Sequence, residues 1–426
     1  MWMWSFQRVS RATLSAWRLV AALYAPYKLI VGVVQLWWHL YAECTDVKRQ
    51  AAARAEADFA HLLHSLPELA AQWEAKLSRR RWAGRGIVVV AGGERYALLA
   101  QRLLHSLQHS GCKLPVEIFY LGREERECTA MDELVELAKT ACAQVIFRDL
   151  LSSYPTLLDV SGYGYAAKAL AIVASSFEEV LLIDADNQAC CDPTFLFSVE
   201  QYTEAGALFW CDMYAFDEKF VRMYDPWQVR RWPTRIDSWL QDALDWWLLS
   251  RIRAKPDFSA ALQAVGVQSS QLTCESGQLV IHKTRCRRGL AAAMLLNMNS
   301  HRPTVYAGLH GDKDTFHIGF RAVGVPFHCT GNRPDLGGAV DAAGCFYDTC
   351  FIQRAPSSKQ AVFAHYCGRH RGDERGECPT TYMTGVGRPF RRWPEDDRRG
   401  YTGGTVLTVP LHTLSTMPVQ HVTSHM

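Results

Sequence analysis

The sequence predicts an α/β fold with a mostly parallel sheet and helices on both of its faces. Two observations support this prediction. From Gly86 onwards, short apolar runs rich in β-branched residues alternate with helical stretches, and one of these runs leads directly into Asp184 and Asp186. Such alternation is typical of parallel sheets, whose ligands bind beyond the carboxyl ends of the strands. We therefore expect a ligand site at the two aspartates.

The expected elements follow one another regularly in the first half of the chain and less regularly in the second. Strands are expected at Gly86–Ala91, Val116–Leu121, Val145–Phe147 and Val180–Ile183, then at Ala207–Trp210 and Gln278–His282. Helices are expected at Arg95–His109, Met131–Ala141 and Ala166–Ser175, then at Ser238–Arg251, Arg285–Asn297 and Asp314–Val323.

The composition is that of a folded chain without a strong charge. Of the 426 residues, 49% are hydrophobic and 21% are charged, and the net charge is +3. This length fits one large α/β domain with terminal extensions, and so small a charge indicates no nucleic-acid partner. The 14 cysteines contain no C-x-x-C pair, which argues against structural zinc. Most are expected to be buried, although Cys345 and Cys350 could form a disulfide in an oxidising compartment.

An apolar segment near the N-terminus, Leu19–Ala42, is long enough to cross a bilayer, which takes about 20 residues. Basic residues precede it and would hold the N-terminus in the cytosol; they are Arg8, Arg11 and Arg18. Lys28 and Pro26 inside the segment favour the alternative, an interfacial or packed amphipathic helix. The chain is thus divided into a tail with a possible single-pass membrane anchor (1–42), a helical stem (43–85), a catalytic domain (86–370) and a mostly irregular tail (371–426).

Asp184 and Asp186 lie two residues apart directly after an apolar run. In an extended chain they project to the same side and can face one ion. Mn²⁺ or Mg²⁺ takes carboxylate and phosphate oxygens together, and would neutralise the diphosphate that leaves when a nucleotide-sugar gives up its sugar. The bare D-x-D pattern also fits a pair that only ends a strand and caps a turn.

Haloacid-dehalogenase-like phosphatases share this pattern, with the first aspartate as nucleophile, and are an alternative. In that family the motif normally ends the first strand of the domain, whereas three expected strands precede it here. Asn187 also replaces the usual Thr or Val. Both differences disfavour a phosphatase.

Several segments, in matching order and spacing, resemble the fungal-type α-1,3-mannosyltransferase family of Golgi enzymes, glycosyltransferase family 71. The resemblance runs from about Gly86 to Gly368, and its strongest pieces are YAAKALAIVASSFEEVLLIDADN, DPTFLF, GALFW, ESGQLVIHK and GDKDTF. It implies a GT-A type, Rossmann-like mixed sheet, a divalent metal (Mn²⁺ or Mg²⁺), GDP-mannose as donor and transfer with retention to a glycan or glycoprotein. The Golgi location of that family, together with the possible anchor Leu19–Ala42, predicts a Golgi membrane protein of type II with a lumenal catalytic domain.

The resemblance assigns a role to several polar residues. Asp184 and Asp186 match the carboxylates that hold the metal and diphosphate, and His365 matches a further metal ligand, with His370 as the second candidate. Lys168 matches a basic residue that reaches the diphosphate or sugar, a task suited to a compact point charge. A solvated helix lysine and an ordinary loop histidine are the plainer interpretations of Lys168 and His365.

The ESGQ segment before the expected strand is assigned to the sugar. Glu275 would stabilise positive charge in an oxocarbenium-like transition state, act as a nucleophile or hold the acceptor. Gln278 would bind sugar hydroxyls, and Gly277 would allow close approach of the backbone. An exposed glutamate ahead of a strand is the plainer alternative for Glu275. The family commonly has aspartate at the position of His282, which bears on donor or acceptor preference.

Two further pairs complete the expected site. Asp312 and Asp314 would contact donor or acceptor hydroxyls, although either could also cap the helix that follows. Ala91 and Gly92 would approach the nucleotide base and ribose.

A UDP-sugar transferase of the same architecture and a catalytically inactive lumenal binding protein remain as alternatives, and the intact acidic residues argue against the second.

Overall fold

The computed structural model describes residues 47–366, except 48, 142, 154–164, 216–255, 269, 341–345, 357 and 359, together with four short strands after residue 380. The chain divides into two compact units, Met1–Ala55 with Tyr224–Asp257 and Glu56–Met223 with Phe258–Met426. All strands described below belong to the second unit. The expected anchor Leu19–Ala42 and the expected helix Ser238–Arg251 lie outside the described residues.

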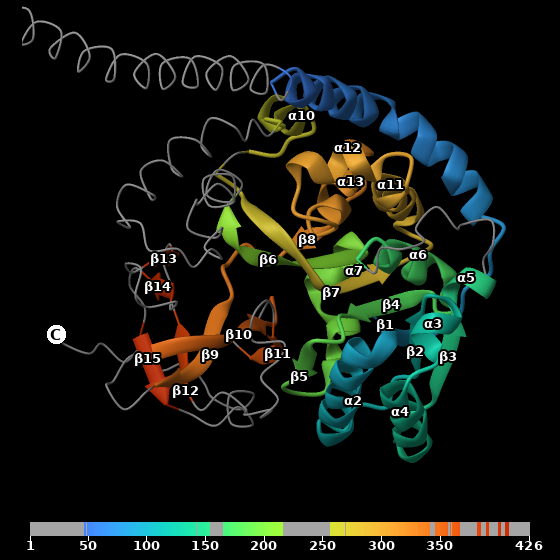
Figure 1. Ribbon diagram of the computed structural model, residues 1–426, viewed down its shortest axis with the longest axis vertical. Helices are drawn as coiled ribbons and strands as arrows, with labels where there is room; N and C mark the ends of the chain where they lie inside the picture. The colour runs from blue at the N-terminus through green and yellow to red at the C-terminus, as the bar shows by residue number, and fades with distance from the viewer. Residues whose placement is uncertain are drawn as a thin grey trace, which may run out of the picture. The chain divides into compact units, whose positions relative to one another are not determined.

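A seven-stranded sheet in the order β3-β2-β1-β4-β7-β6-β8 forms the centre of this unit (Figure 1). Its strands are β1 (Arg85–Val90), β2 (Val116–Tyr120), β3 (Val145–Asp149), β4 (Glu179–Ile183), β6 (Ala207–Ala215), β7 (Leu272–His282) and β8 (His328–Cys329). Strands β1 to β4 pair in parallel, whereas β7 runs antiparallel to both β4 and β6. The predicted α/β fold, with a mixed sheet that is mostly parallel in its N-terminal half, is confirmed.

Helices cover both faces of this sheet, because successive residues of its central strands point to opposite sides. Val88 of β1 lies in a core with α6 (Ala167–Ala174), α11 (Arg287–Asn297) and α13 (Thr315–Ala322). Its neighbours Ile87 and Val89 lie in a second core with α2 (Gly93–His109) and α4 (Thr129–Thr140). The shorter helices are α3 (Gly122–Arg126), α5 (Leu150–Ser153), α7 (Glu200–Ala205), α10 (Ser259–Ala264), α12 (Arg302–Gly308) and the 3₁₀ helix η2 (Pro193–Ser198).

The segment expected as a stem contains a helix over residues 49–77. From Phe59 onwards its apolar side chains are buried in the same core as α11 and α13; they include Leu62, Leu66, Ala70 and Leu77. The Phe59 ring stacks on Phe258 with a centroid separation of 3.9 Å. This part of the segment therefore packs against the core that contains α11 and α13.

A six-stranded antiparallel sheet in the order β15-β12-β9-β10-β11-β5 forms a second layer of structure (Figure 1). It consists of β5 (Asn187–Ala189), β9 (Asp335–Val340), β10 (Phe346–Arg354), β11 (Ala361–His365), β12 (Thr381–Thr384) and β15 (Thr405–Thr408). Strands β13 (Pro389–Arg391) and β14 (Arg399–Tyr401) form a separate pair. Four short strands thus lie in the tail that the sequence predicts to be mostly irregular.

Among the described residues, no helix combines the length and apolar character needed to cross a membrane.

Candidate active site

A tight turn at the carboxyl end of β4 carries Asp184 and Asp186. The Asn187 amide donates a hydrogen bond to the Asp184 carbonyl at 3.0 Å, and the Asp184 amide donates to the Gly277 carbonyl of β7 at 2.7 Å. The two aspartates were expected in an extended chain, but Ala185 and Asp186 form a turn. Their convergence therefore comes from the turn and its anchoring on β7, not from strand alternation.

His365 joins the two aspartates. Oxygen atoms of Asp184 and Asp186 and a ring nitrogen of His365 all lie within 4.8 Å of one another, and His365 Nε2 is 3.2 Å from Asp186 Oδ1. The backbone fixes this arrangement, because β11 pairs with β5 so that His365 lies opposite Asn187. The Tyr366 amide also donates to the Asp186 carbonyl at 2.9 Å. His370, the second candidate, lies outside the described residues.

His365 is enclosed by carboxylates. Burial by itself would lower the pKa of His365, but Asp186 and Glu275 outweigh it and raise that pKa well above its ordinary value. Burial also raises the pKa of Asp184 to about 6, against the opposing effect of Lys168. The cluster therefore concentrates negative charge in a space that favours a cation, either a proton on the imidazole or a metal ion.

Lys168 of α6 is a buried member of the site and not a solvated helix lysine. Its Nζ lies 2.7 Å from Asp184 Oδ2 and 3.3 Å from Asp312 Oδ2, and it donates to Ser276 Oγ at 3.1 Å. Burial alone would lower the pKa of Lys168, but the two aspartates raise it. Lys168 is therefore charged, and it ties α6, the aspartate turn and the loop before α13 together.

Glu275 was expected ahead of a strand, but it lies inside β7 and is 1% exposed. Phe209 pairs with Leu279 and Trp210 with Glu275, so residues 276–278 have no partner in β6 and form a bulge. The bulge turns the Ser276 and Gly277 amides onto Glu275 Oε1, at 2.9 and 3.1 Å.

The second carboxylate oxygen of Glu275 faces two basic groups. Its Oε2 lies 3.2 Å from Lys313 Nζ and 3.6 Å from His365 Nδ1. Burial alone would raise the pKa of Glu275, but Lys313 and His365 hold it well below its usual range. Glu275 is therefore a buried, ionised carboxylate beside the three possible metal ligands.

Gly277 is required by the closeness of its neighbours. A Cβ atom at this position would lie 2.6 Å from His365 Cε1 and 3.1 Å from Asn187 Nδ2. The Gly277 carbonyl also accepts a hydrogen bond from Asn187 Nδ2 at 2.9 Å. The neighbouring Gln278 is fully buried, and within the described part of the chain neither of its amide atoms makes a hydrogen bond.

Asp312 and Asp314 have separate surroundings. Asp312 faces Lys168, as described above. Asp314 occupies the cap position of α13, but its side chain makes no capping hydrogen bond. Its Oδ1 accepts one from the Cys274 amide of β7 at 3.1 Å. Asp314 thus fixes the backbone next to Glu275.

Lys313 and Asp212 belong to the site but were not predicted from the sequence. Lys313 Nζ lies 2.8 Å from Asp212 Oδ2 in addition to its contact with Glu275. Asp212 is buried within β6. It follows the apolar run GALFWC, so the signal that identified Asp184, an aspartate directly after an apolar strand, was also present at Asp212.

Residues 84–355, more than half of the chain, match the family model described as "Mannosyltransferase putative". The chain belongs to this family.

Curated relatives of this mannosyltransferase family member include two fungal proteins. Alpha-1,2-mannosyltransferase MNN2 of Saccharomyces cerevisiae is 29% identical over 293 residues, which cover 64% of this chain and 45% of the relative. Alpha-1,2-mannosyltransferase MNN23 of Candida albicans is 27% identical over 250 residues, covering 54% and 39%. The chain spans less than half the length of these relatives. Their names specify α-1,2 transfer, not the α-1,3 transfer in the name of the family that the sequence resembles.

Solved structures with some similarity include mouse xyloside xylosyltransferase 1 in its apo form and galactosyltransferase LgtC in complex with donor and acceptor sugar analogs. The first has a TM-score of 0.34 and 14% identity, and covers 58% of this chain and 85% of the other. The second has a TM-score of 0.32 and 13% identity, and covers 55% and 69%. The fold assignment rests on strand order and register, not on these similarities.

The two residues that the resemblance assigns to the nucleotide, Ala91 and Gly92, lie at the opposite end of the parallel strands from His282. Ala91 follows β1, and Val88 pairs with Leu182 of β4, so Ala91 and Gly92 share the carboxyl edge with Asp184. His282 pairs with Glu179 at the start of β4 and is about 13 Å of strand from Gln278. The departure from the family at His282 is therefore not at the aspartate turn.

Glycine is required at position 92 because the Glu125 side chain lies too close to leave room for a Cβ atom. A Cβ atom there would lie 2.1 Å from Glu125 Oε2. That oxygen accepts a hydrogen bond from the Leu121 amide at 2.7 Å, and burial raises the pKa of Glu125. Glu125 therefore fills the space directly beside Gly92.

Proposed function

We propose that this protein is a metal-dependent α-mannosyltransferase that moves mannose from GDP-mannose to a glycan or glycoprotein with retention. The observation that carries the proposal is the buried group of Asp184, Asp186 and His365, with the ionised Glu275 beside it, in a chain of the mannosyltransferase family. The names of its curated relatives favour an α-1,2 linkage.

The residues at the aspartate turn fit a divalent cation. Two carboxylates and one imidazole suit Mn²⁺, which accepts nitrogen ligands more readily than Mg²⁺. The steric limit at Gly277 leaves the His365 ring room beside the aspartates. Asp184, Asp186 and His365 would hold the ion, which when bound would neutralise the diphosphate of the donor.

The remaining residues would act on the sugar and on the charges around it. Glu275, kept ionised by Lys313, would stabilise the positive charge that develops on the transferred mannose. Lys168 would hold Asp184 and Asp312 in place and contribute positive charge near the diphosphate. The buried amide of Gln278, and the carboxylate of Asp312, would hydrogen-bond sugar hydroxyls. Ala91 and Gly92 would lie near the nucleotide.

We extend the proposal to the cellular setting, a Golgi membrane with a single type II anchor at Leu19–Ala42 and a lumenal catalytic domain. The apolar run and the arginines before it support this arrangement. In sealed vesicles the catalytic domain should resist added protease until detergent opens the membrane. Digestion in intact vesicles would place the domain on the cytosolic side and contradict the proposal.

The function is tested by incubating the protein with a panel of nucleotide-sugars and measuring nucleotide release. We expect GDP release from GDP-mannose with Mn²⁺, loss of that release with a chelator or in Asp186→Ala, and no loss in Asp132→Ala, whose carboxylate is an exposed partner of Arg126. Faster nucleotide release from a UDP-sugar than from GDP-mannose would show that the donor is a UDP-sugar. Release that is unaffected by the chelator would refute metal dependence, and phosphate release from simple monoesters would indicate a phosphatase.

A further inference from the structure

Three cysteine side chains meet where β6, β7 and β8 lie side by side. Cys329 Sγ lies 3.0 Å from Cys211 Sγ and 3.6 Å from Cys274 Sγ. Strand pairing produces this cluster, since Cys211 is the cross-strand partner of Cys274 and β8 flanks β6 on its other side. A disulfide bond is about 2.05 Å long, so the first pair needs a movement of about 1 Å to become bonded.

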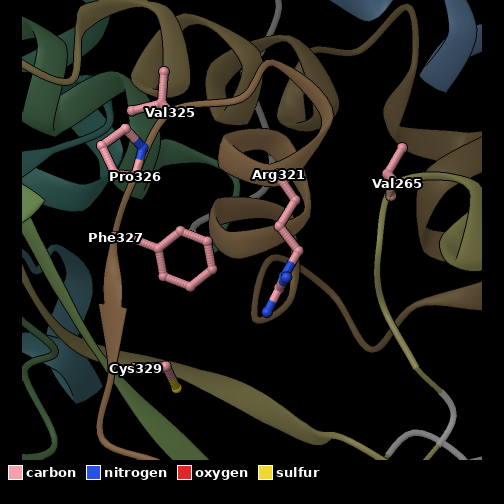
Figure 2. Close-up of a pocket in the computed structure, with 6 residues that line it drawn as sticks. All are labelled: Val265, Arg321, Val325, Pro326, Phe327 and Cys329. Atoms are coloured by element: carbon pink, nitrogen blue, oxygen red, sulfur yellow. The ribbon is translucent and has the colours of Figure 1, made fainter.

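A pocket of about 510 Å³ gives access to this cluster from outside (Figure 2). It is lined by Val265, Arg321, Val325, Pro326, Phe327 and Cys329. Figure 2 shows the Arg321 side chain extending between Phe327 and Val265. Cys329 is half-buried, whereas Cys211 and Cys274 are buried. A small reagent in the pocket would therefore meet Cys329 first.

The three thiols differ in acidity. Hydrogen bonds from the Cys211 and Cys274 thiols lower the pKa of Cys329 to about 3, against the opposing effect of burial. The same bond with Cys329 raises the pKa of Cys211. The thiolate is the nucleophile in disulfide exchange, and the sulfur that lines the pocket is the one whose pKa favours the thiolate.

We propose that Cys329 is a thiol–disulfide exchange site for a small anionic disulfide of the glutathione type, and that Cys211 completes the exchange to give a Cys211–Cys329 disulfide. A cationic side chain, Arg321, lines the same pocket as Cys329, which suits a reagent that carries carboxylates. This proposal is independent of the sugar chemistry.

The exchange balances in two steps. The Cys329 thiolate attacks one sulfur of the small disulfide, forms a mixed disulfide and releases one thiolate, which takes up a proton from solvent. The Cys211 thiol then gives up its proton and attacks Cys329 Sγ, and the second small thiolate leaves and takes up a proton. Two protein thiols are oxidised, and the small disulfide is reduced to two thiols.

The bond would be formed next to the charged residues of the candidate active site. Cys211 directly precedes Asp212, and Cys274 directly precedes Glu275. These two acidic residues are the partners of Lys313. A Cys211–Cys329 bond would join β6 to β8 at this point and leave Cys274 as a free thiol.

To test this proposal, the folded wild-type chain is treated with oxidised glutathione and the reaction is quenched with acid. The remaining thiols are then alkylated, and the peptides are mapped by mass spectrometry. We expect a Cys211–Cys329 disulfide that dithiothreitol reverses, and loss of the Cys329 thiol at least about tenfold faster than loss of the buried Cys286 thiol. In the double variant with Cys211→Ser and Cys274→Ser, one glutathione should remain on Cys329. The matched control Cys286→Ser should behave like wild type.

Three results would overturn the proposal: unreacted Cys329, a glutathione adduct that persists on Cys329 in the wild-type chain, or a disulfide that joins Cys329 only to Cys274. The wild-type peptide map decides among these results without any variant, so a failure of the double variant to fold would leave the test intact.

Discussion

Lys313 lies between Asp212 and Glu275, with its Nζ 2.8 Å from Asp212 Oδ2 and 3.2 Å from Glu275 Oε2. The two carboxylates come from neighbouring strands, β6 and β7. Lys313 thereby neutralises part of the negative charge that these strands bring together. It also fixes the Glu275 oxygen that faces His365.

Replacing Glu275 by glutamine tests its role in the transition state. The change keeps size and hydrogen bonding but removes a charge, so we expect kcat to fall by roughly 10²-fold or more. The KM for the donor should change little, because the ground-state sugar carries no positive charge. Steady-state kinetics with both substrates measure the effect. A raised acceptor KM with unchanged kcat would mean that Glu275 only holds the acceptor.

Lys313→Met tests whether this lysine keeps Glu275 ionised. Removing the positive charge raises the pKa of Glu275, which Lys313 now helps to hold well below its usual range. The acidic limb of the kcat–pH profile should therefore move to higher pH. Lys139→Met, which changes an exposed lysine on α4, is the control and should leave the profile in place. An unchanged acidic limb in Lys313→Met would contradict the assigned role.

Gly277→Ala tests the packing against His365. The added Cβ atom would lie 2.6 Å from His365 Cε1, so the ring must leave its present position beside the two aspartates. We expect weaker Mn²⁺ binding, by about tenfold or more, with little loss of folded protein, since altered support of metal ligands commonly has this effect. Calorimetric titration with Mn²⁺ measures it. Ser276→Ala, which adds no volume, should bind the ion more tightly than Gly277→Ala; equal affinities would refute the steric argument.

The burial of the Lys283 amine predicts that the stability of the fold depends on pH. Its Nζ donates to the carbonyls of Ile172 and Ser175 at 2.9 and 2.8 Å. Burial lowers the pKa of Lys283 to about 6, from an ordinary value of 10.5. Between these values the unfolded chain binds a proton that the folded chain does not. The free energy of unfolding should therefore rise with pH in this window, by up to about 1.4 kcal/mol per pH unit.

The measurement is chemical unfolding of wild type and Lys283→Met at pH 6.5 and pH 9. Wild type should gain stability relative to the variant at the higher pH. Lys139→Met, the exposed control, should follow wild type. If the free energies of unfolding of wild type and Lys283→Met differ by the same amount at both pH values, the two carbonyls keep Lys283 charged and the prediction is wrong.

Local patterns were enough to predict the parallel half of the sheet and the position of Asp184 and Asp186 at the carboxyl end of β4. Apolar runs and the helices between them are encoded by neighbouring residues, so the positions of β1, β2, β3 and β4 along the chain could be predicted. The bulge at residues 276–278 has no local signal, because it depends on how β6 pairs with β7. For that reason Glu275 was expected outside the strand that contains it.

Contacts between distant residues explain what the sequence analysis missed. Lys313 stands between two aspartates that were singled out, but its partner Asp212 is 101 positions away along the chain. The packing of Phe59 on Phe258 likewise joins residues that are far apart in the sequence. Composition suggested a polar stem for the helix over residues 49–77, because a narrow apolar stripe is diluted by the charged residues around it.

The pairing of β5 with β11 has a consequence for folding kinetics. Asn187 and His365 face each other across this pair although the strands β6 to β10 lie between them in the chain. Closing so long a loop is slow compared with forming local helices and neighbouring parallel strands. The Asn187–Asp184 hydrogen bond that closes the aspartate turn is local and can form early, while its imidazole partner arrives only when β11 pairs with β5. With the proposed metal site, the rate of Mn²⁺ binding during refolding would therefore report the rate at which β11 pairs with β5.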